Sequence, residues 1–363
     1  MALILIWTGF FLLVLLLLAL DLTVLHRKAH VVEMKEALLM SAFWIALGLL
    51  FSLVVYFGYE NHWLGLGKGV DAVDGAINDG QSAIIKYLTG YVVEKSLSVD
   101  NIFVIAMLFG FFAVPAIYQH RVLFWGILGA LAMRAAMIAI GATLIAQFHW
   151  ILYLFGAFLI LTAFKMLFLN SESSDPNRNV VVRLTRKLFP ITSHYHGEHF
   201  FVRAGSPASH EEDVPGGKEE PDDTVDRTKK GTLMATPLLL ALVMVETTDL
   251  IFAVDSIPAI FAITADPFLV FTSNVFAVLG LRSLYFALAG MMASFKYLKP
   301  ALAAVLLLVG VKMLVAGWLR DVLGEYFNFY VLGAVLLILA AGVIASLLSR
   351  TSVTRNRTED IQA

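Results

Sequence analysis

Carboxylate residues inside two apolar segments are the features of this sequence that could do chemistry. The first segment carries Glu94 and Asp100, and the second carries Glu246, Asp249 and Asp255. Each ionised group at the centre of a bilayer costs about 2.5–3.5 kcal/mol on insertion scales. Such residues persist where they are paired, protonated or bound to a cation. We therefore take these two segments as the candidate functional region.

Neutral oxygen atoms accompany the carboxylates, from Ser98, Asn101, Thr248 and Ser256. Sites built from oxygen ligands suit hard divalent cations, so these residues leave Mg²⁺, Mn²⁺ and Ca²⁺ open. The sequence has no cysteine and the acidic segments have no histidine, which argues against a Cu⁺ or Zn²⁺ specialist.

Basic residues provide the competing structural explanation. Arg134 and Arg282 lie near the middle of apolar segments that follow the acidic ones, and Lys95 adjoins Glu94. We expect these residues to pair with some of the acids. Pairing explains a single carboxylate well, but a purely structural protein has little reason to bury all five.

Helical spacing limits which carboxylates can meet. Glu246 and Asp249 are three residues apart and share one helix face. Glu94 and Asp100 are about 600° of rotation apart and face different ways, as do Asp249 and Asp255.

Convergence of the acids therefore requires interrupted helices. We predict local unwinding near Ser96 to Asp100, and a second break before Pro258, which lacks one helix hydrogen bond. Discontinuous helices of this kind form ion sites in secondary transporters.

Composition places these segments in a membrane. Hydrophobic residues make up 59% of the 363 residues, and charged residues only 15%. A membrane-spanning helix needs about twenty apolar residues. Nine candidate spans follow, at residues 3–22, 37–58, 84–112, 121–145, 150–169, 233–262, 268–291, 301–319 and 328–348.

Loop charge predicts the orientation of the chain. Basic residues lie after the first, third, fifth and seventh spans and in the tail, whereas the loop after the second span is acidic. Positive loops stay inside. We expect a plasma (inner) membrane protein with the N-terminus outside and the C-terminus cytoplasmic.

A weak internal repeat organises the spans. It aligns Asp100 with Asp249, Arg134 with Arg282, and Lys165 with Lys312. Each unit holds three helices, so the second enters the membrane from the opposite side. We expect both lysines to reach toward the membrane interfaces.

The predicted fold is an all-α membrane protein with about nine transmembrane helices and an inverted repeat of three helices each. Residues 1–83 form two N-terminal helices and an outer loop, 84–170 the first repeat, 171–232 a partly disordered cytoplasmic loop, 233–320 the second repeat, and 321–363 the last helix and a cytoplasmic tail.

The cytoplasmic loop carries weaker signals. Residues 206–230 are rich in Pro, Gly, Glu and Asp, which predicts disorder. Residues 180–189 form a short amphipathic helix, either on the membrane surface or simply solvated. Metal binding by His194, His196, Glu198 and His199 is less well supported than a solvated loop.

The two acidic segments resemble the signature segments of the TerC/Alx family of integral membrane proteins. The resemblance rests on Glu94 with Leu-Ser-Val-Asp-Asn at 97–101, and on Glu-Thr-Thr-Asp at 246–249 with Phe-Ala-Val-Asp-Ser-Ile-Pro-Ala at 252–259. It implies inverted three-helix repeats and a link to manganese export and to alkaline or tellurite stress. It also implies a metal site made by Glu94, Asp100, Asn101, Glu246, Asp249 and Asp255. The stretch 205–230 departs from the family pattern as an insertion.

These observations favour an exporter of a divalent cation, with Mn²⁺ preferred on the resemblance alone and protons as a candidate coupling ion. The alternative is a non-transporting membrane partner of a stress-resistance or metalation and insertion complex, with the cytoplasmic loop binding a protein. An intramembrane aspartyl protease fits poorly, because its Gly-Asp motif is missing. We expect no enzyme activity, no organic cofactor and, at a net charge of −2, no nucleic-acid partner.

Overall fold

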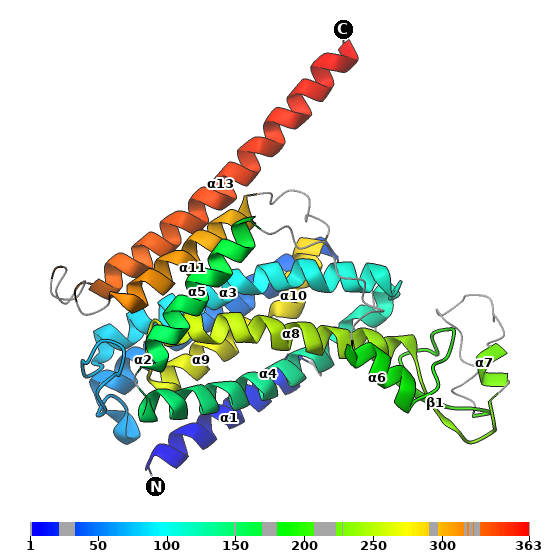
Figure 1. Cartoon of the computed structure of the whole chain (residues 1–363), viewed down its shortest axis with the longest axis horizontal. Helices are drawn as coiled ribbons and strands as arrows, with labels where there is room; N and C mark the ends of the chain where they lie inside the picture. Colours follow the sequence, from blue (N-terminus) through cyan, green and yellow to red (C-terminus); the bar gives the residue numbers. More distant parts are fainter. Residues whose placement is uncertain are drawn as a thin grey trace.

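Long apolar helices make up most of this protein (Figure 1). The computed structural model describes residues 2–21, 33–148, 150–168, 180–206, 223–226, 228–289, 297–315, 318, 322 and 327–362. The elements in chain order are α1 (Ala2–Leu20), α2 (Met34–Glu60), a 3₁₀ turn η2 (Trp63–Gly65), α3 (Gly80–Phe111), α4 (Ala116–Gln147), α5 (Ile151–Phe168), α6 (Val180–Leu188), β1 (Phe201–Arg203), α7 (Asp223–Asp226), β2 (Leu233–Ala235), α8 (Pro237–Phe261), α9 (Pro267–Val278), α10 (Leu281–Ala289), α11 (Leu298–Leu314) and α13 (Phe327–Gln362).

The helices confirm an all-α membrane protein. Among the described residues, five helices are long and apolar enough to cross a membrane, namely α2, α4, α5, α8 and the first part of α13. The bent pair α9 and α10 makes a sixth if it is one span. Helices α1, α3 and α11 lie where spans are expected without meeting the same criteria, so nine spans remain a prediction.

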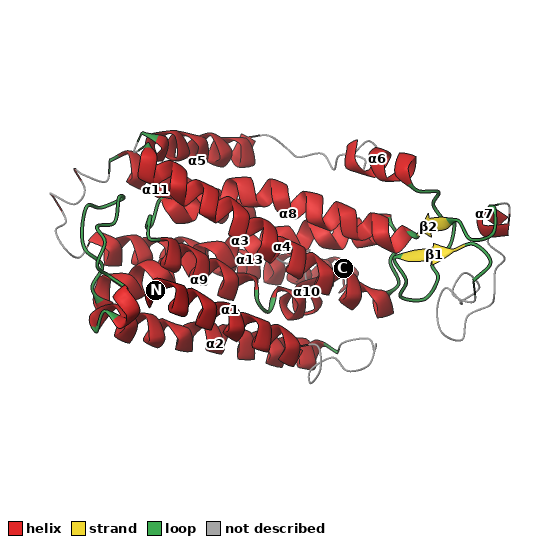
Figure 2. Cartoon of the chain, turned by 90° about the horizontal axis from the view of Figure 1, so that it is seen from below, coloured by secondary structure: helices red, strands yellow, loops and turns green. Residues whose placement is uncertain are grey.

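The acidic helices α3 and α8 pack against each other in the bundle (Figure 2). Helix α3 packs against α2, α8 and α9, and α8 packs against α3 and α4. Helix α5 runs alongside α11, where Gly156 and Gly310 let the backbones approach: a Cβ on Gly310 would lie 3.0 Å from the Gly156 carbonyl oxygen. Small residues commonly allow such close approach between membrane helices.

The two ends of the bundle differ (Figure 2). The α2–α3 loop lies at one end, where Lys86 at the start of α3 pairs with Asp71 at 2.9 Å and with Asp74 at 2.8 Å. Asp71 also accepts hydrogen bonds from the Thr264 hydroxyl and from the backbone N–H of Ala265 at 2.9 Å. This buried network fastens the loop to the turn between α8 and α9.

The opposite end carries α6 and a small antiparallel sheet, in which Val202 of β1 pairs with Met234 of β2. The segments on either side of the predicted insertion therefore pair directly. Residues 207–222 and 227, which make up most of the stretch predicted to be disordered, lie outside the described residues. The predicted span at 233–262 begins too early, because 233–235 pair with β1 and the helix starts only at Pro237.

The predicted helix breaks are wrong. Helix α3 runs unbroken through Ser96, whose hydroxyl donates to the Val92 carbonyl at 2.6 Å. Helix α8 continues through Pro258, which lies in its last turn and still accepts from the N–H of Ala262. A proline this close to the helix end removes one hydrogen bond without interrupting the remainder.

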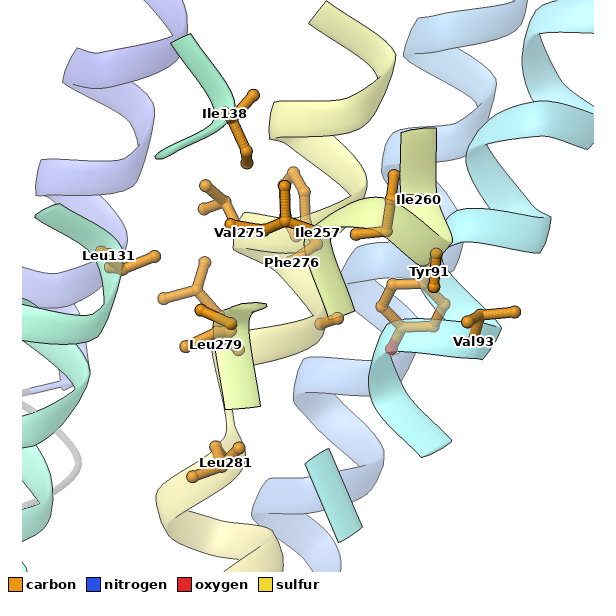
Figure 3. Close-up of a cluster of buried hydrophobic side chains, with 14 of the residues drawn as sticks. Tyr91, Val93, Leu131, Ile138, Ile257, Ile260, Val275, Phe276, Leu279 and Leu281 are labelled. Carbon is orange, nitrogen blue, oxygen red and sulfur yellow. The ribbon is translucent and has the colours of Figure 1, made fainter. Parts of the chain in front are cut away.

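The observed break separates α9 from α10, which bend by 41°. Gly280 lies at the break with φ +80, and a Cβ there would lie 2.5 Å from the Cβ of Trp44. Figure 3 shows the apolar core around this point, where Leu279 and Leu281 flank the break near Val275 and Phe276. Glycine is required here by both the left-handed backbone and the close approach of α2.

Lys312 also differs from expectation, since it is only 2% exposed. Its ammonium donates to the carbonyls of Ala262 at 2.9 Å and Ile263 at 3.4 Å, just beyond the end of α8. A cation at a helix C-terminus satisfies carbonyls that have no partner within the helix. Lys165, its counterpart in the predicted repeat, is exposed at the end of α5.

Candidate cation site

Arg134 is the centre of the candidate site. It lies in the middle of α4 and is 1% exposed. Its Nη1 donates to Oε1 of Glu94 and, at 3.3 Å, to Oδ1 of Asn274. Its Nε and Nη2 donate to the two oxygens of Asp249 at 3.3 and 3.1 Å. One guanidinium thus joins residues of α3, α8 and α9.

The second acidic residue of α8 faces the same neighbouring helix. Glu246 lies one turn before Asp249, and a Cβ on Gly129 of α4 would overlap its carboxylate. The prediction that Glu246 and Asp249 share a face is confirmed, since both contact α4. The missing side chain at Gly129 makes the space that the Glu246 carboxylate occupies.

Several buried oxygens of the predicted site are free. Within the part of the chain that the structure describes, Oε2 of Glu94, Oε2 of Glu246 and the hydroxyls of Ser98 and Ser256 have no hydrogen-bond partner. Buried polar atoms normally have partners, so such exceptions mark places where a ligand or water can bind.

Asp255 lies apart from Arg134. Its Oδ1 accepts a hydrogen bond from the Thr162 hydroxyl of α5 at 3.3 Å, so it contacts a different neighbour from Asp249. This separation follows from the unbroken helix, in which a six-residue offset points to another face.

The remaining predicted residues are distributed along the same helices. Asn101 is buried on α3, Thr248 is half-buried on α8, and Pro258 is buried near the end of α8. Asp100 belongs to α3, but its side chain lies outside what the structure describes.

Two basic residues bind partners other than the predicted acids. Arg282 of α10 pairs with Asp21, immediately after α1, at 2.7 Å. Lys95 donates to the carbonyls of Ala277 at 3.0 Å and Leu279 at 3.4 Å, at the end of α9. Its ammonium therefore supports the break between α9 and α10 instead of neutralising Glu94.

The loop histidines form no metal site that the structure reveals. Glu198 pairs with Arg121 of α4 at 2.7 Å and lies 4.0 Å from His120. Among all described residues, no group of three or more His, Asp or Glu side chains could hold a metal ion. This finding applies to the described membrane carboxylates as well.

Three residues that contact the buried charges were missed by the sequence analysis. Asn274 contacts Arg134, Gly129 makes room for Glu246, and Asp21 pairs with Arg282. Asn274 could have been noticed as the lone amide in the apolar run of α9. Gly129 carries no local signal, because only the packing of α4 against α8 brings it to Glu246.

Chemically, the described site can hold positive charge. Glu94, Glu246 and Asp249 carry three negative charges when ionised, and Arg134 supplies one positive charge to this group. Their negative charge exceeds the positive charge of Arg134, and a bound cation could balance the excess.

Comparisons with known proteins agree with this membrane architecture. A family model described as "Integral membrane protein TerC family" matches residues 79–354. The chain is 45% identical to "Putative membrane-bound redox modulator Alx" of Escherichia coli strain K12, over 86% of each chain. It is 40% identical to a protein of the same name from Photorhabdus laumondii, over 97% of this chain and 98% of that one. It is also 45% identical to "Uncharacterized membrane protein STKORF319" of Myxococcus xanthus, over 86% of this chain and 84% of that one. No solved structure matches the chain.

Proposed function

We propose that this chain, which belongs to the TerC family of integral membrane proteins, exports a divalent metal cation across the membrane. The observation that carries the proposal is the buried carboxylate group around Arg134. Buried charges within membrane helices are costly and usually mark ion or substrate pathways. Glu94, Glu246 and Asp249 carry more negative charge when ionised than Arg134 balances, and a cation could make up the difference.

The packing supports two repeat units that share this site. Helix α4 packs against α8, and α9 packs against α3, so the middle helix of each unit contacts the acidic helix of the other. Helices α5 and α11, the last of each unit, pack together. In this proposal, Glu94 comes from the first unit and Asp249 from the second, and rocking of the units alternates access to the site.

The cation and the direction rest on separate reasoning. Oxygen ligands suit Mn²⁺, Mg²⁺ and Ca²⁺ alike, and Mn²⁺ is chosen on the resemblance described above. Export as the direction of transport is chosen on the same resemblance. Protons replacing the departed cation on the carboxylates would supply the driving force.

Flux through liposomes that contain the purified full-length protein tests the proposal. We expect protein-dependent, saturable Mn²⁺ flux, measured by quenching of an enclosed dye, with Mg²⁺ and Ca²⁺ assayed in parallel. Flux of none of the three would overturn the proposed function. Flux that ignores an imposed pH gradient would remove only the proton coupling.

A variant of Asp255 asks whether the carboxylate that lies apart from Arg134 belongs to the pathway. Asp255→Asn should abolish flux while the protein still folds and inserts. Asp79→Asn is the matched control, because Asp79 caps the exposed end of α3 and asparagine caps helices equally well. A fully active Asp255→Asn would give that carboxylate a structural role.

A non-transporting membrane partner is the second candidate function. It is favoured by the sheet and α6, which stand at the end of the bundle opposite the α2–α3 loop and offer a surface to another protein (Figure 2). The related Alx proteins carry the name of redox modulators. The printed sequence of this chain has no cysteine, so thiol–disulfide chemistry is not open to these residues. Deletion of residues 206–230 distinguishes the two functions. If the chain is an exporter, transport should survive the deletion; if it is a non-transporting partner, its function should be lost.

A further inference from the structure

We propose that Arg134 is an internal substitute for the transported cation: it holds Glu94 and Asp249 when the cation is absent and must release Asp249 when the cation binds. This inference rests on the proposed export of a divalent cation and specifies how its site is kept when empty. The contacts of Arg134, and not its mere burial, carry the inference.

The guanidinium uses all three of its nitrogens on this group. Both oxygens of Asp249 accept from it, through Nε and Nη2, in the two-pronged geometry that makes Arg–carboxylate pairs strong. Its third nitrogen, Nη1, donates to Glu94 and to the amide oxygen of Asn274. Every polar contact of Arg134 that the structure shows therefore goes to this one group.

A metal ion and this guanidinium compete for the same oxygens. Divalent cations bind carboxylate oxygens directly, at about 2.0–2.6 Å. In this structure the Arg134 guanidinium binds both Glu94 and Asp249, so it uses carboxylate oxygens that a cation would also use. Arg134 donates to both oxygens of Asp249, and its positive charge repels a second cation at the same carboxylate. A cation therefore binds Asp249 favourably only as Arg134 leaves it.

The free oxygens show where a cation could bind first. Glu94 uses only Oε1 for Arg134, and its Oε2 has no partner among the described residues. Oε2 of Glu246 is likewise buried without a described partner. A cation can therefore bind either of these oxygens before it displaces Arg134 from Asp249. The negative charge of Asp249 then has a positive partner at every stage of the exchange.

The exchange would serve the transport cycle in two ways. An empty site with three ionised carboxylates would be costly inside the membrane, and Arg134 reduces that cost by supplying positive charge. Competition also weakens the apparent affinity for the cation, because only molecules in which Arg134 has left Asp249 bind the cation fully. The weaker affinity helps the cation to dissociate on the far side of the membrane. Arg134 is in this sense a positioning residue and not a ligand.

Binding of Mn²⁺ to the purified full-length protein tests the inference. Arg134→Gln should tighten the Mn²⁺ dissociation constant at least about tenfold, because the competitor is gone. The same variant should slow steady-state Mn²⁺ flux at least about tenfold, because the empty site loses its counter-charge. Tighter binding with slower flux is a combination that a merely structural arginine would not produce.

Arg134→Lys keeps the positive charge. If Arg134→Gln does not fold, Arg134→Lys tests instead whether Arg134 competes with the cation for Asp249. A lysine cannot contact both oxygens of Asp249 in the two-pronged geometry, so Mn²⁺ binding should tighten several-fold. Arg121→Gln is the matched control, since it breaks an Arg–Glu pair on the same helix, with Glu198, outside the site. Its Mn²⁺ affinity should equal that of the wild type.

Two results separate the inference from the function that it rests on. Wild-type protein that binds Mn²⁺ saturably, together with folded Arg134 variants of equal or weaker affinity, would overturn the role of Arg134 and leave the export proposal standing. Wild-type protein that neither binds nor transports Mn²⁺, Mg²⁺ or Ca²⁺ would overturn both.

Discussion

Arg134 on α4 donates to both carboxylate oxygens of Asp249 on α8, at 3.3 and 3.1 Å. The two residues are 115 positions apart in the chain and belong to different proposed repeat units. Their pairing therefore links the two halves of the protein at the buried charges.

Replacement of Asp249 tests that link. Asp249→Asn removes one negative charge and weakens two charge-assisted hydrogen bonds, each of a kind worth about 1.5–3 kcal/mol. We expect Mn²⁺ flux in liposomes to fall at least about tenfold. Asp79→Asn, at the exposed start of α3, should retain wild-type flux. Full flux in Asp249→Asn would exclude this carboxylate from the site.

Gly129 offers a test that changes no charge. A methyl group at this position overlaps the Glu246 carboxylate, so Gly129→Ala should displace Glu246 and reduce Mn²⁺ flux severalfold. Because the overlap is with the far end of a flexible side chain, Glu246 can turn aside at little cost in stability, which the better helix propensity of alanine further offsets. Gly110→Ala in α3 adds a methyl group to open space and should leave flux unchanged. Equal flux in the two variants would argue against a role for Glu246.

Gly280, at the bend between α9 and α10, should not tolerate a side chain without a loss of stability. Gly280→Ala places a side chain on a backbone with φ +80 and against Trp44, which should lower the free energy of unfolding by about 2–4 kcal/mol. Thermal unfolding of the detergent-purified protein measures the loss. Gly333→Ala in α13 meets nothing within 4 Å and is the control. A Gly280→Ala protein as stable as this control would mean that α2 moves away from the bend without cost.

The network at the α2–α3 loop predicts a dependence of stability on pH. Burial alone would raise the pKa of Asp71, but the Lys86 ammonium and hydrogen bonds from Thr264 and Ala265 outweigh burial and lower the pKa below its ordinary value. A lowered folded-state pKa means that Asp71 stabilises the protein above its unfolded pKa of about 4, and that this contribution disappears as the pH falls through the folded pKa.

Asp71→Asn should therefore cost about 1.5–3 kcal/mol at neutral pH, because Lys86 loses one charged partner and keeps Asp74. The difference in melting temperature between Asp71→Asn and the wild type should shrink as the pH approaches 3. A difference that is the same at pH 7 and pH 3 would contradict the assignment of the lowered pKa to Asp71.

Part of this organisation follows from local sequence. Runs of about twenty apolar residues predict membrane helices whatever their neighbours are, and α2, α4, α5, α8 and α13 appear where these runs lie. The shared face of Glu246 and Asp249 follows from helical periodicity alone. The unusual charges within apolar segments also identified Arg134 as a partner for the acids.

The partners of the buried charges were decided by tertiary structure. Arg134 and Arg282 occupy matching positions in the predicted repeat, yet one binds Glu94 and Asp249 while the other binds Asp21. Lys165 and Lys312 also match, yet only Lys312 is buried against the carbonyls after α8. Spacing along a helix defines the face on which a charge lies, but not which helix packs against that face.

The carboxylates inside two apolar segments could thus be recognised from the sequence, because a charge in an apolar run is a local anomaly. The break at Gly280 instead of near Ser96 or Pro258 could not, because it depends on the close approach of Trp44 from α2 and on Lys95 reaching the carbonyls at the end of α9. The sequence alone determined that negative charge lies within long apolar segments. Only the packing of α4 against α8 and of α3 against α9 placed one arginine among those charges, since that contact joins residues more than a hundred positions apart.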